Sequence, residues 1–235
     1  MMLSIVIPVY NEAETVRTLV GRVVSVEYGL PFEVILVDDA STDGTADVLE
    51  ALPDEFSGFT LRRFKHERNR GKGAAVRTGL AEAKGELVVV QDADLEYNPR
   101  EIPKLLRPVL EGEADVVFGS RFIGGQSRRV LYFWHSVANH WLTVASNMFT
   151  NLNQTDMECC YKLFRREILD QIKLREERFG FEPEVTAKVA RLPGVRIFEV
   201  GVSYAGRTYE QGKKIGMRDG VRALWCVLKY NVWSR

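Results

Sequence analysis

The stretch Val88-Val89-Val90-Gln91-Asp92-Ala93-Asp94-Leu95-Glu96 passes from β-branched residues to a series of acids. Its apolar part has the composition of a strand buried on both faces, as in a parallel sheet. The acids follow at spacings of two, directly where that strand ends. This order indicates an open α/β sheet, because such sheets bind their ligands beyond the carboxyl ends of the strands.

The same alternation of strand and helix extends in both directions from this stretch. Strands are predicted at residues 3–9, 32–37, 59–64, 86–91 and 115–119, and helices at 12–26, 45–52, 73–83 and 99–110. Further on, helices are predicted at 130–152, 183–191 and 217–232, with strands at 161–164 and 195–202. The pattern predicts a single α/β domain over residues 1–235, whose mostly parallel, Rossmann-like sheet is covered by helices on both faces.

Polar residues follow four of the predicted strands. They are Asn11 with Glu12, Asp38 with Asp39, Asp92 with Asp94, and Ser120 with Arg121. Since the carboxyl ends of parallel strands meet at one edge of a sheet, these side chains are predicted to line one polar crevice.

Composition excludes several classes of protein. Lysine plus arginine total 32 and aspartate plus glutamate total 32, so no net charge attracts nucleic acid. Three cysteines, two of them adjacent, favour a reduced cytosolic compartment. Pro8 interrupts the first apolar run, which argues against a signal peptide, and no uncharged run is long enough to span a bilayer. We therefore expect a cytoplasmic chain that is soluble or peripheral to a membrane.

The acid cluster itself suggests a metal site. Carboxylates this close repel one another, and a divalent cation relieves that repulsion. Oxygen ligands favour Mg²⁺ or Mn²⁺ held together with phosphate oxygens. The alternative is a solvated acidic loop at the start of the helix near Pro99. The Asp-x-Asp triplet alone does not decide between them.

The end of the first strand argues against two nucleotide-binding classes. A dinucleotide-binding enzyme carries Gly-x-Gly-x-x-Gly there, whereas this chain has Pro8-Val9-Tyr10-Asn11-Glu12. A nucleotidyltransferase needs a glycine-rich loop to hold a triphosphate, and none follows this strand.

Five motifs together, spread over roughly residues 3–210, resemble the family 2 glycosyltransferases of GT-A fold. They are Ile7-Pro8-Val9-Tyr10-Asn11-Glu12, Val37-Asp38-Asp39-Ala40-Ser41-Thr42-Asp43-Gly44-Thr45, Asn69-Arg70-Gly71-Lys72-Gly73, Gln91-Asp92-Ala93-Asp94-Leu95-Glu96 and Gly119-Ser120-Arg121. A narrower resemblance is to the dolichol-phosphate mannose synthases and related polyprenyl-phosphate glycosyltransferases. It rests on residues 91–99, 160–166 and 179–184.

The resemblance implies roles for these residues. Residues 1–121 would bind the nucleotide sugar, and residues 122–235, with amphipathic helices, the acceptor. Base and ribose would contact Pro8, Tyr10, Asn11, Glu12 and either Asp38 or Asp39, with Lys72 near the nucleotide. The metal ligands would be Asp92, Asp94 and Glu96, and positive charge for the diphosphate or the acceptor phosphate would come from Arg121, Arg207 and Lys213 with Lys214. For Asp39 the alternative role is a turn or cap residue, and for Lys72 a solvated loop lysine.

Asp94, Arg121 and Asp156 form the expected catalytic set. Asp156 resembles the general base that the wider family uses toward a hydroxyl acceptor. A phosphate monoester, whose second pKa is about 6, needs no base near neutrality. With such an acceptor, Asp156 would instead orient an arginine or lysine that holds the phosphate.

The aromatic helix at 130–152 and the basic, tryptophan-bearing end of the chain suit a lipid interface, although such stripes also form cores or dimer contacts. The expected activity is metal-dependent, inverting transfer of a sugar, mannose or glucose, from a nucleoside diphosphate sugar to a polyprenyl (dolichyl-type) phosphate. The alternatives are transfer to a hydroxyl of a polysaccharide or glycolipid, and a non-catalytic nucleotide-sugar-binding subunit. A homodimer or a membrane partner subunit is compatible with either.

Overall fold

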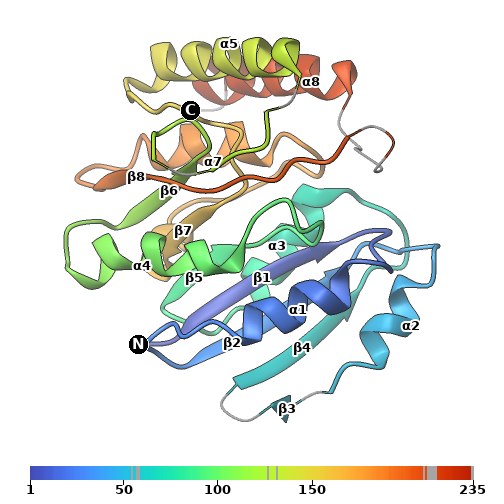
Figure 1. Ribbon diagram of the computed structural model, residues 1–235. Helices are drawn as coiled ribbons and strands as arrows, with labels where there is room; N and C mark the ends of the chain where they lie inside the picture. The colour runs from blue at the N-terminus through green and yellow to red at the C-terminus, as the bar shows by residue number, and fades with distance from the viewer. Residues whose placement is uncertain are drawn as a thin grey trace.

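The computed structural model describes residues 1–53, 55–56, 59–125, 127–130, 132–208, 210 and 216–233. These residues form one sheet with helices packed around it (Figure 1). The strands are β1 (Leu3–Val9), β2 (Phe32–Asp38), β3 (Glu55–Phe56), β4 (Phe59–Lys65), β5 (Leu87–Val90), β6 (Val116–Ser120), β7 (Lys162–Arg165) and β8 (Ile197–Gly201). The helices are α1 (Val16–Val24), α2 (Thr45–Glu50), α3 (Lys72–Glu82), α4 (Ile102–Leu110), α5 (Phe133–Thr150), α6 (Arg166–Leu169), α7 (Phe181–Val189) and α8 (Met217–Leu228).

The sheet is mixed but mostly parallel, as predicted. Within the described residues its strand order is β3-β4-β2-β1-β5-β7-β6-β8. β4, β2, β1 and β5 pair in parallel, and so do β6 and β8. β7 runs antiparallel to both of its neighbours, and the short β3 antiparallel to β4. The order of the central strands places the ends of β2, β1, β5 and β6 along one edge.

The reversed direction of β7 positions the loop that precedes it. Val89 near the end of β5 pairs with Leu163 near the start of β7, and Phe118 of β6 pairs with Lys162. The chain therefore enters β7 from the same edge at which β5 and β6 end. The segment that carries Asp156 consequently joins the four strand ends at the carboxyl edge of the sheet.

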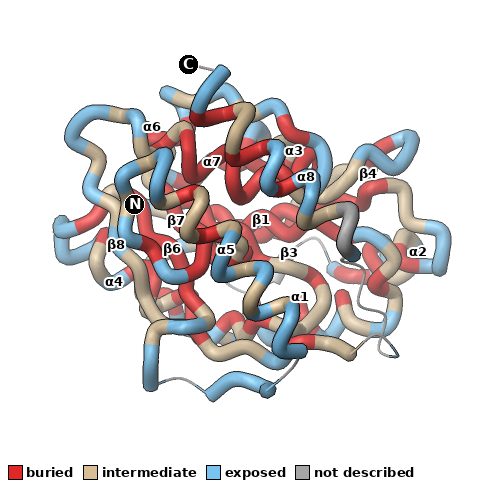
Figure 2. Tube along the Cα trace, turned by 90° about the horizontal axis from the view of Figure 1, so that it is seen from above, coloured by how far each residue is buried: buried red, intermediate tan, exposed pale blue. Residues whose placement is uncertain are grey.

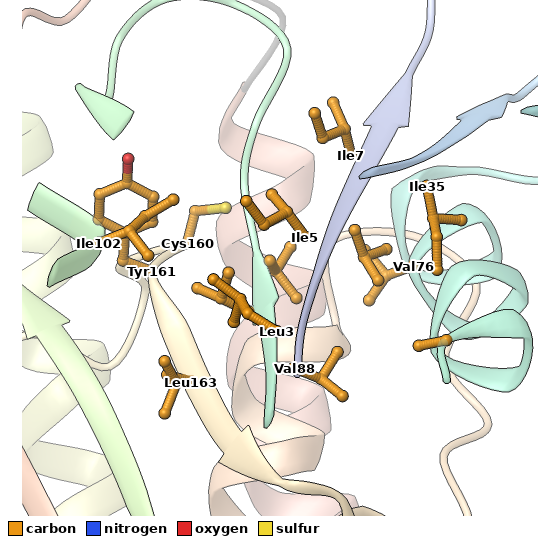
Figure 3. Packing of buried hydrophobic residues seen from close by; sticks show 14 of the residues in the cluster. Leu3, Ile5, Ile7, Ile35, Val76, Val88, Ile102, Cys160, Tyr161 and Leu163 are labelled. Carbon is orange, nitrogen blue, oxygen red and sulfur yellow. The ribbon is translucent and has the colours of Figure 1, made fainter. Parts of the chain in front are cut away.

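The core explains why these apolar runs form strands. Every residue of β1 is buried, because helices cover both faces of the sheet. Figure 3 shows Leu3 and Ile5 of β1 in one cluster with Val76 of α3 on one side and Ile102 of α4 on the other. Burying each such side chain contributes about 1.5–3 kcal/mol. Figure 2 shows the buried residues at the centre of the molecule and exposed ones around it.

Small residues let α3 approach the sheet closely. A Cβ atom added at Gly79 would lie 2.3 Å from Cγ1 of Val6 in β1, closer than any two such atoms can come. The alanine-rich composition of this helix is thus a consequence of its packing. Because α3 begins at Lys72, this contact also sets how far that lysine stands from the sheet edge.

An outer pair of helices, α5 and α8, lies side by side above α7 (Figure 1). Their exposed faces carry large apolar side chains. These are Phe133, Trp134, Trp141, Met148 and Phe149 of α5, with Val221, Leu224, Trp225, Val232 and Trp233 of α8 and the turn of π-helix that follows it (Lys229–Trp233). Trp134 and Trp141 keep 74% and 65% of their surface exposed. We call this set of side chains the apolar face.

Glu176 binds α8 and the turn that follows it to the rest of the molecule. Its buried carboxylate accepts hydrogen bonds from Arg222 (2.6 Å), Lys229 (2.8 Å) and the Tyr230 hydroxyl (2.7 Å). Burial opposes this charge, but these hydrogen bonds outweigh it and lower the pKa of Glu176 to about 2. The next residue, Glu177, accepts a hydrogen bond from the backbone of Ala74 in the first turn of α3. One short segment thus contacts both α8 and α3.

The structure differs from the sequence-based prediction mainly at the ends of elements. The first helix begins at Val16 rather than at residue 12, because Glu12 and the following residues form a turn. α5 is shorter than the predicted 130–152 at both ends, and α7 begins at Phe181, so that Pro183 lies in its first turn. β3, α6 and the antiparallel direction of β7 were not predicted.

Candidate active site

The loops at the carboxyl edge bring most of the predicted site residues together. Asp38 and Asp39 follow β2, Glu12 follows β1, and the acid cluster follows β5. Arg121 follows β6, and Asp156 lies in the loop that leads into β7. Lys213 and Lys214 lie outside the described residues, so their predicted role stays a prediction.

The two aspartates after β2 have different surroundings. Asp39 accepts hydrogen bonds from His66 Nδ1 (2.6 Å) and from the backbone of Arg70 (2.9 Å) and Gly71 (2.6 Å). It therefore anchors the loop that leads into α3. Asp38 accepts from the backbone and hydroxyl of Ser41 through Oδ1, whereas its Oδ2 is buried and has no hydrogen-bond partner in the described part of the chain. Of the two, Asp38 has the oxygen that a ligand can use.

The turn after β1 is held in a defined shape. Pro8 lies within β1 opposite Val37, and Tyr10 is exposed at the rim. Asn11 adopts a left-handed backbone conformation with φ of 51°, and its side chain accepts a hydrogen bond from the backbone of Thr42 at 2.8 Å. Asparagine tolerates this conformation because its side chain bonds locally to the backbone. The turn is thus fixed against the loop that follows β2.

The acid cluster curls, as a shared site requires. Leu95 has a φ of 63°, which turns the chain between Asp94 and Glu96. Burial, together with the charges of Asp92 and Glu96, raises the pKa of Asp94 to about 7. Glu96 uses both carboxylate oxygens within the protein, accepting from the Tyr204 hydroxyl at 2.7 Å and from the backbone of Arg207 at 2.5 Å.

Arg207 connects three parts of the site. Its guanidinium donates to both carboxylate oxygens of Glu12, at 3.1 and 2.7 Å, and to the backbone carbonyl of Asp94, at 3.0 and 2.6 Å. The last segment before α8 is thereby tied to the turn after β1 and to the acid cluster. A bidentate pair of this kind is both stronger and more directional than a single contact.

The residues present fit a divalent cation in part. In the described portion of the chain, no group of three or more His, Cys, Asp and Glu side chains is placed to hold a metal ion. Asp92 and Asp94 offer carboxylate oxygens, and burial, with repulsion from Asp92 and Glu96, raises the pKa of Asp94 to about 7. Magnesium characteristically uses one or two carboxylates together with substrate phosphates. The donor set therefore fits Mg²⁺ or Mn²⁺ held by Asp92, Asp94 and a diphosphate.

Lys72 is half-buried and paired with the acid cluster, so it is not a solvated loop residue. Its ammonium lies 2.9 Å from Oδ1 of Asp92 and 3.2 Å from Oε1 of Glu182 in α7. Burial works against the charge, yet Asp92 and Glu182 hold the pKa of Lys72 well above its usual value. Lys72 is thus a permanent cation that joins the end of β5 to the start of α7.

Arg121 and Asp156 form the second charged pair of the site. The carboxylate is fully buried and accepts from Nε of Arg121 at 2.7 Å, from its Nη2 at 2.7 Å and from its backbone N at 2.9 Å. Asn139 of α5 donates to the same carboxylate at 3.1 Å. The side chain of Arg121 is still 17% exposed, so it can contact a ligand, whereas Asp156 is enclosed.

Sequence reasoning missed several residues that complete these pairs. Asn139 and Tyr204 support Arg121 and Glu96, and Glu199 of β8 accepts from the backbone of Asp156 at 3.1 Å. Glu182 lay inside a motif that carried the resemblance, but no role was predicted for it. Asn139 and Glu182 lie within predicted helices or their approaches rather than after a strand, so the spacing gave no signal for them. Tyr204 does follow the strand predicted at 195–202, as Asn11 follows the first strand, and this signal was overlooked.

Comparisons with known proteins agree with this picture. The model of the glycosyl transferase family 2 matches residues 4–173. Among curated proteins, a dodecaprenyl-phosphate galacturonate synthase of Rhizobium johnstonii is 32% identical over 214 residues, covering 90% of this chain and 61% of that protein. An undecaprenyl-phosphate 4-deoxy-4-formamido-L-arabinose transferase of Serratia proteamaculans is 33% identical over 212 residues, covering 89% and 62%. The chain thus spans about three-fifths of the length of these relatives.

Solved structures show the same fold. The glucosyl-3-phosphoglycerate synthase of Mycobacterium tuberculosis, in complex with Mn²⁺, uridine diphosphate and phosphoglyceric acid, superposes with a TM-score of 0.75. It is 21% identical, and the match covers 98% of this chain and 78% of that one, so the likeness concerns the fold. The α/β architecture is the GT-A fold predicted from the sequence. Because the family model matches well over half of its length, the chain belongs to the glycosyl transferase family 2.

Proposed function

We propose that this protein transfers a sugar from a nucleoside diphosphate sugar to a polyprenyl phosphate. A phosphate oxygen of the acceptor attacks C1 of the sugar, the bond from C1 to the β-phosphate oxygen breaks, and the nucleoside diphosphate leaves. The configuration at C1 is inverted. The names of the relatives, which are a dodecaprenyl-phosphate and an undecaprenyl-phosphate sugar enzyme, support an acceptor of this kind.

The bidentate pair between Arg121 and Asp156 carries this proposal. A hydroxyl acceptor must lose a proton during attack and requires a base. Asp156 is enclosed and its oxygens already accept four hydrogen bonds from Arg121 and Asn139, so it is poorly placed to take that proton. A phosphate acceptor arrives already ionised and needs instead a fixed cation. The pair presents a guanidinium in a fixed orientation, which suits phosphate recognition.

The donor is proposed to lie along the other strand ends. The unpartnered oxygen of Asp38 would receive the base or ribose, and the diphosphate would reach Asp92 and Asp94. A bound Mg²⁺ or Mn²⁺ would neutralise the charge that develops on the leaving diphosphate. Arg207 holds the acid cluster against the turn after β1, so that both ends of the donor meet a rigid surface.

The apolar face is proposed to lie on a membrane at its cytoplasmic side. Tryptophans at the rim of a helix pair prefer the interface between lipid headgroups and acyl chains. Asn139, which supports the Arg121 pair, belongs to the same helix α5 as Trp134 and Trp141. A lipid phosphate at that interface would therefore arrive near Arg121. No helix in the described part of the chain is long and apolar enough to cross a bilayer.

Two acceptors of equal chain length test the proposal. Purified protein is incubated with Mn²⁺, a radiolabelled nucleotide sugar and either polyprenyl phosphate or the corresponding polyprenol. We expect labelled lipid with the phosphate only. Label in the polyprenol, or in a polysaccharide or glycolipid hydroxyl, would favour the hydroxyl mechanism. Binding of the nucleotide sugar without transfer to any acceptor would favour a non-catalytic subunit that works with a membrane partner.

A further inference from the structure

Two buried carboxylate oxygens, of Glu182 and Glu158, have no hydrogen-bond partner among the residues that the structure describes. Glu182, at the start of α7, is only 4% exposed. Its Oε1 lies 3.2 Å from Lys72, but its Oε2 is buried without a hydrogen bond among the described residues. Oε1 of Glu158, in the loop before β7, is likewise buried without a hydrogen bond among the described residues. Buried polar atoms are almost always paired, so each exception calls for an explanation.

A purely structural role does not account for Glu182. Acids in the first turn stabilise a helix by binding free backbone N–H groups and by opposing the helix dipole. Glu184, the other acid of that turn, accepts from the backbone of Arg175 (2.8 Å) and Glu176 (2.7 Å) in the segment before α7. Oε2 of Glu182 accepts from no backbone group among the described residues. Glu182 points elsewhere, toward Lys72.

Glu182 stands one side chain away from the proposed diphosphate site. Lys72 contacts Glu182 on one side and Asp92 on the other. Since a donor sugar is bonded directly to the β-phosphate, it occupies the space next to the phosphates. Glu158 lies two residues after Asp156, in the loop that enters β7 from the same edge of the sheet. The unpartnered oxygens therefore lie on the side of the sheet edge where the diphosphate is proposed to bind.

We propose that Glu182 and Glu158 form the donor-sugar subsite, where they bind hydroxyl or amino groups of the sugar, and that this subsite excludes uronic acids. The inference rests on the proposed function and specifies the sugar of the donor. The subsite would select a neutral or amino sugar such as mannose or glucose. The galacturonate named for the Rhizobium johnstonii relative falls in the excluded class.

The exclusion follows from the charges already present. A sugar carboxylate would have to draw Lys72 away from Asp92 or Glu182, leaving a buried acid unpaired, which is costly. Burial and the charge of Glu182 already raise the pKa of Glu158 to about 8, so the region disfavours further negative charge. A hydroxyl or amino group, in contrast, donates a hydrogen bond to these oxygens and offsets the free-energy cost of leaving them buried and unpaired.

Matched donor pairs test the subsite. The protein with Mn²⁺ is titrated calorimetrically with uridine and guanosine diphosphates. Next come pairs that differ only at C6, namely UDP-glucose with UDP-glucuronate and GDP-mannose with GDP-mannuronate. We expect the neutral sugar to bind about tenfold or more tightly than the uronate on whichever base binds, the usual worth of a hydrogen bond to a charged group. Equal affinities would overturn the inference while leaving the proposed function intact, whereas no binding of any nucleotide would overturn both.

Variants connect the selection to these residues. Glu182→Gln and Glu158→Gln keep the size of the side chain but remove its charge. Each is expected to reduce the preference for the neutral sugar severalfold while the bare nucleoside diphosphate binds as before. Glu113→Gln, at an exposed loop glutamate, is the control and should retain the full preference. If both subsite variants, confirmed as folded by thermal unfolding, match the control, the inference is wrong.

Discussion

Asp156 accepts two side-chain hydrogen bonds from Arg121, each at 2.7 Å, and lies entirely out of contact with solvent. The pair spans the end of β6 and the loop that enters β7, so the guanidinium is oriented from two sides. Breaking one partner of a buried pair is usually more costly than the pair is worth, because the remaining charge is left uncompensated. Arg121 therefore depends on Asp156 for its position.

Replacing Asp156 with asparagine should weaken acceptor binding without abolishing the chemistry. The amide keeps an oxygen for Arg121 but loses the charge, so the KM for polyprenyl phosphate should rise about tenfold while kcat changes little. Steady-state kinetics measure both, and Asp170→Asn on the exposed surface is the control. Loss of kcat with donor binding unchanged would indicate instead that Asp156 acts as a base.

Removal of the divalent cation should abolish donor recognition. The rise in thermal midpoint that a nucleotide sugar produces is expected to vanish with EDTA and in Asp94→Asn, and to return with Mn²⁺ only in the native chain. Glu96→Gln should behave differently, because both of its oxygens bind Tyr204 and Arg207. It should lower stability while the affinity for Mn²⁺ stays within about threefold. Loss of Mn²⁺ binding in Glu96→Gln would show that Glu96 is a metal ligand, as the sequence predicts.

The apolar face should determine membrane association. Trp134→Ser combined with Trp141→Ser removes two large exposed rings from α5, and vesicle affinity should fall about tenfold or more. Cosedimentation with anionic vesicles measures the affinity. Leu110→Ser, at an exposed apolar residue of α4, should leave it unchanged. Unchanged vesicle binding together with a shift in oligomeric state would show that the face joins two copies of the chain.

Glu176 should make stability depend on acid pH. Its pKa falls from 4.5 to about 2 on folding, so its contribution is complete above pH 4.5 and disappears as the pH falls toward 2. The linkage amounts to at most about 3 kcal/mol. Urea unfolding of the native chain and of Glu176→Gln should give free energies that differ by nearly this amount at pH 7 and converge below pH 3. A constant difference across that range would contradict the linkage.

Two glycine replacements should change stability in opposite directions. Gly79→Ala forces a methyl group against Val6 and should cost about 1–3 kcal/mol through overpacking. In α1 a Cβ added at Gly21 meets no atom of the described residues within 4 Å, so Gly21→Ala should stabilise the fold by up to about 1 kcal/mol. Denaturant unfolding measures both. Destabilisation by Gly21→Ala would show that helix propensity is not the deciding factor there.

The strands and the strand-end residues could be predicted because they depend on local patterns. A continuous apolar run followed by acids, as at Val88 to Asp94, indicates both a buried strand and a ligand edge, and the structure confirms the strand and its position in the sheet. The ends of helices were less accurate, because they depend on turns such as the one at Glu12.

Other features depend on contacts between distant parts of the chain. The distinction between Asp38 and Asp39 arises from His66, Arg70 and Gly71, which reach Asp39 from a later loop. The sequence left that choice open for this reason. Likewise, Glu182 contacts Lys72 only because α7 packs beside the start of α3, and no spacing in the sequence predicts that packing.

Gly71 and Gly73 rest directly on the backbone of the segment that Glu176 begins. Any side chain at either position would collide with the carbonyl oxygens of Glu176 or Glu177. Lys72 lies between these two glycines, so it is supported by the same segment whose Glu176 binds α8 and the turn after it. We expect that a lipid surface that displaces α8 would also shift Lys72. Membrane binding would then change the proposed donor site without the movement of a separate domain.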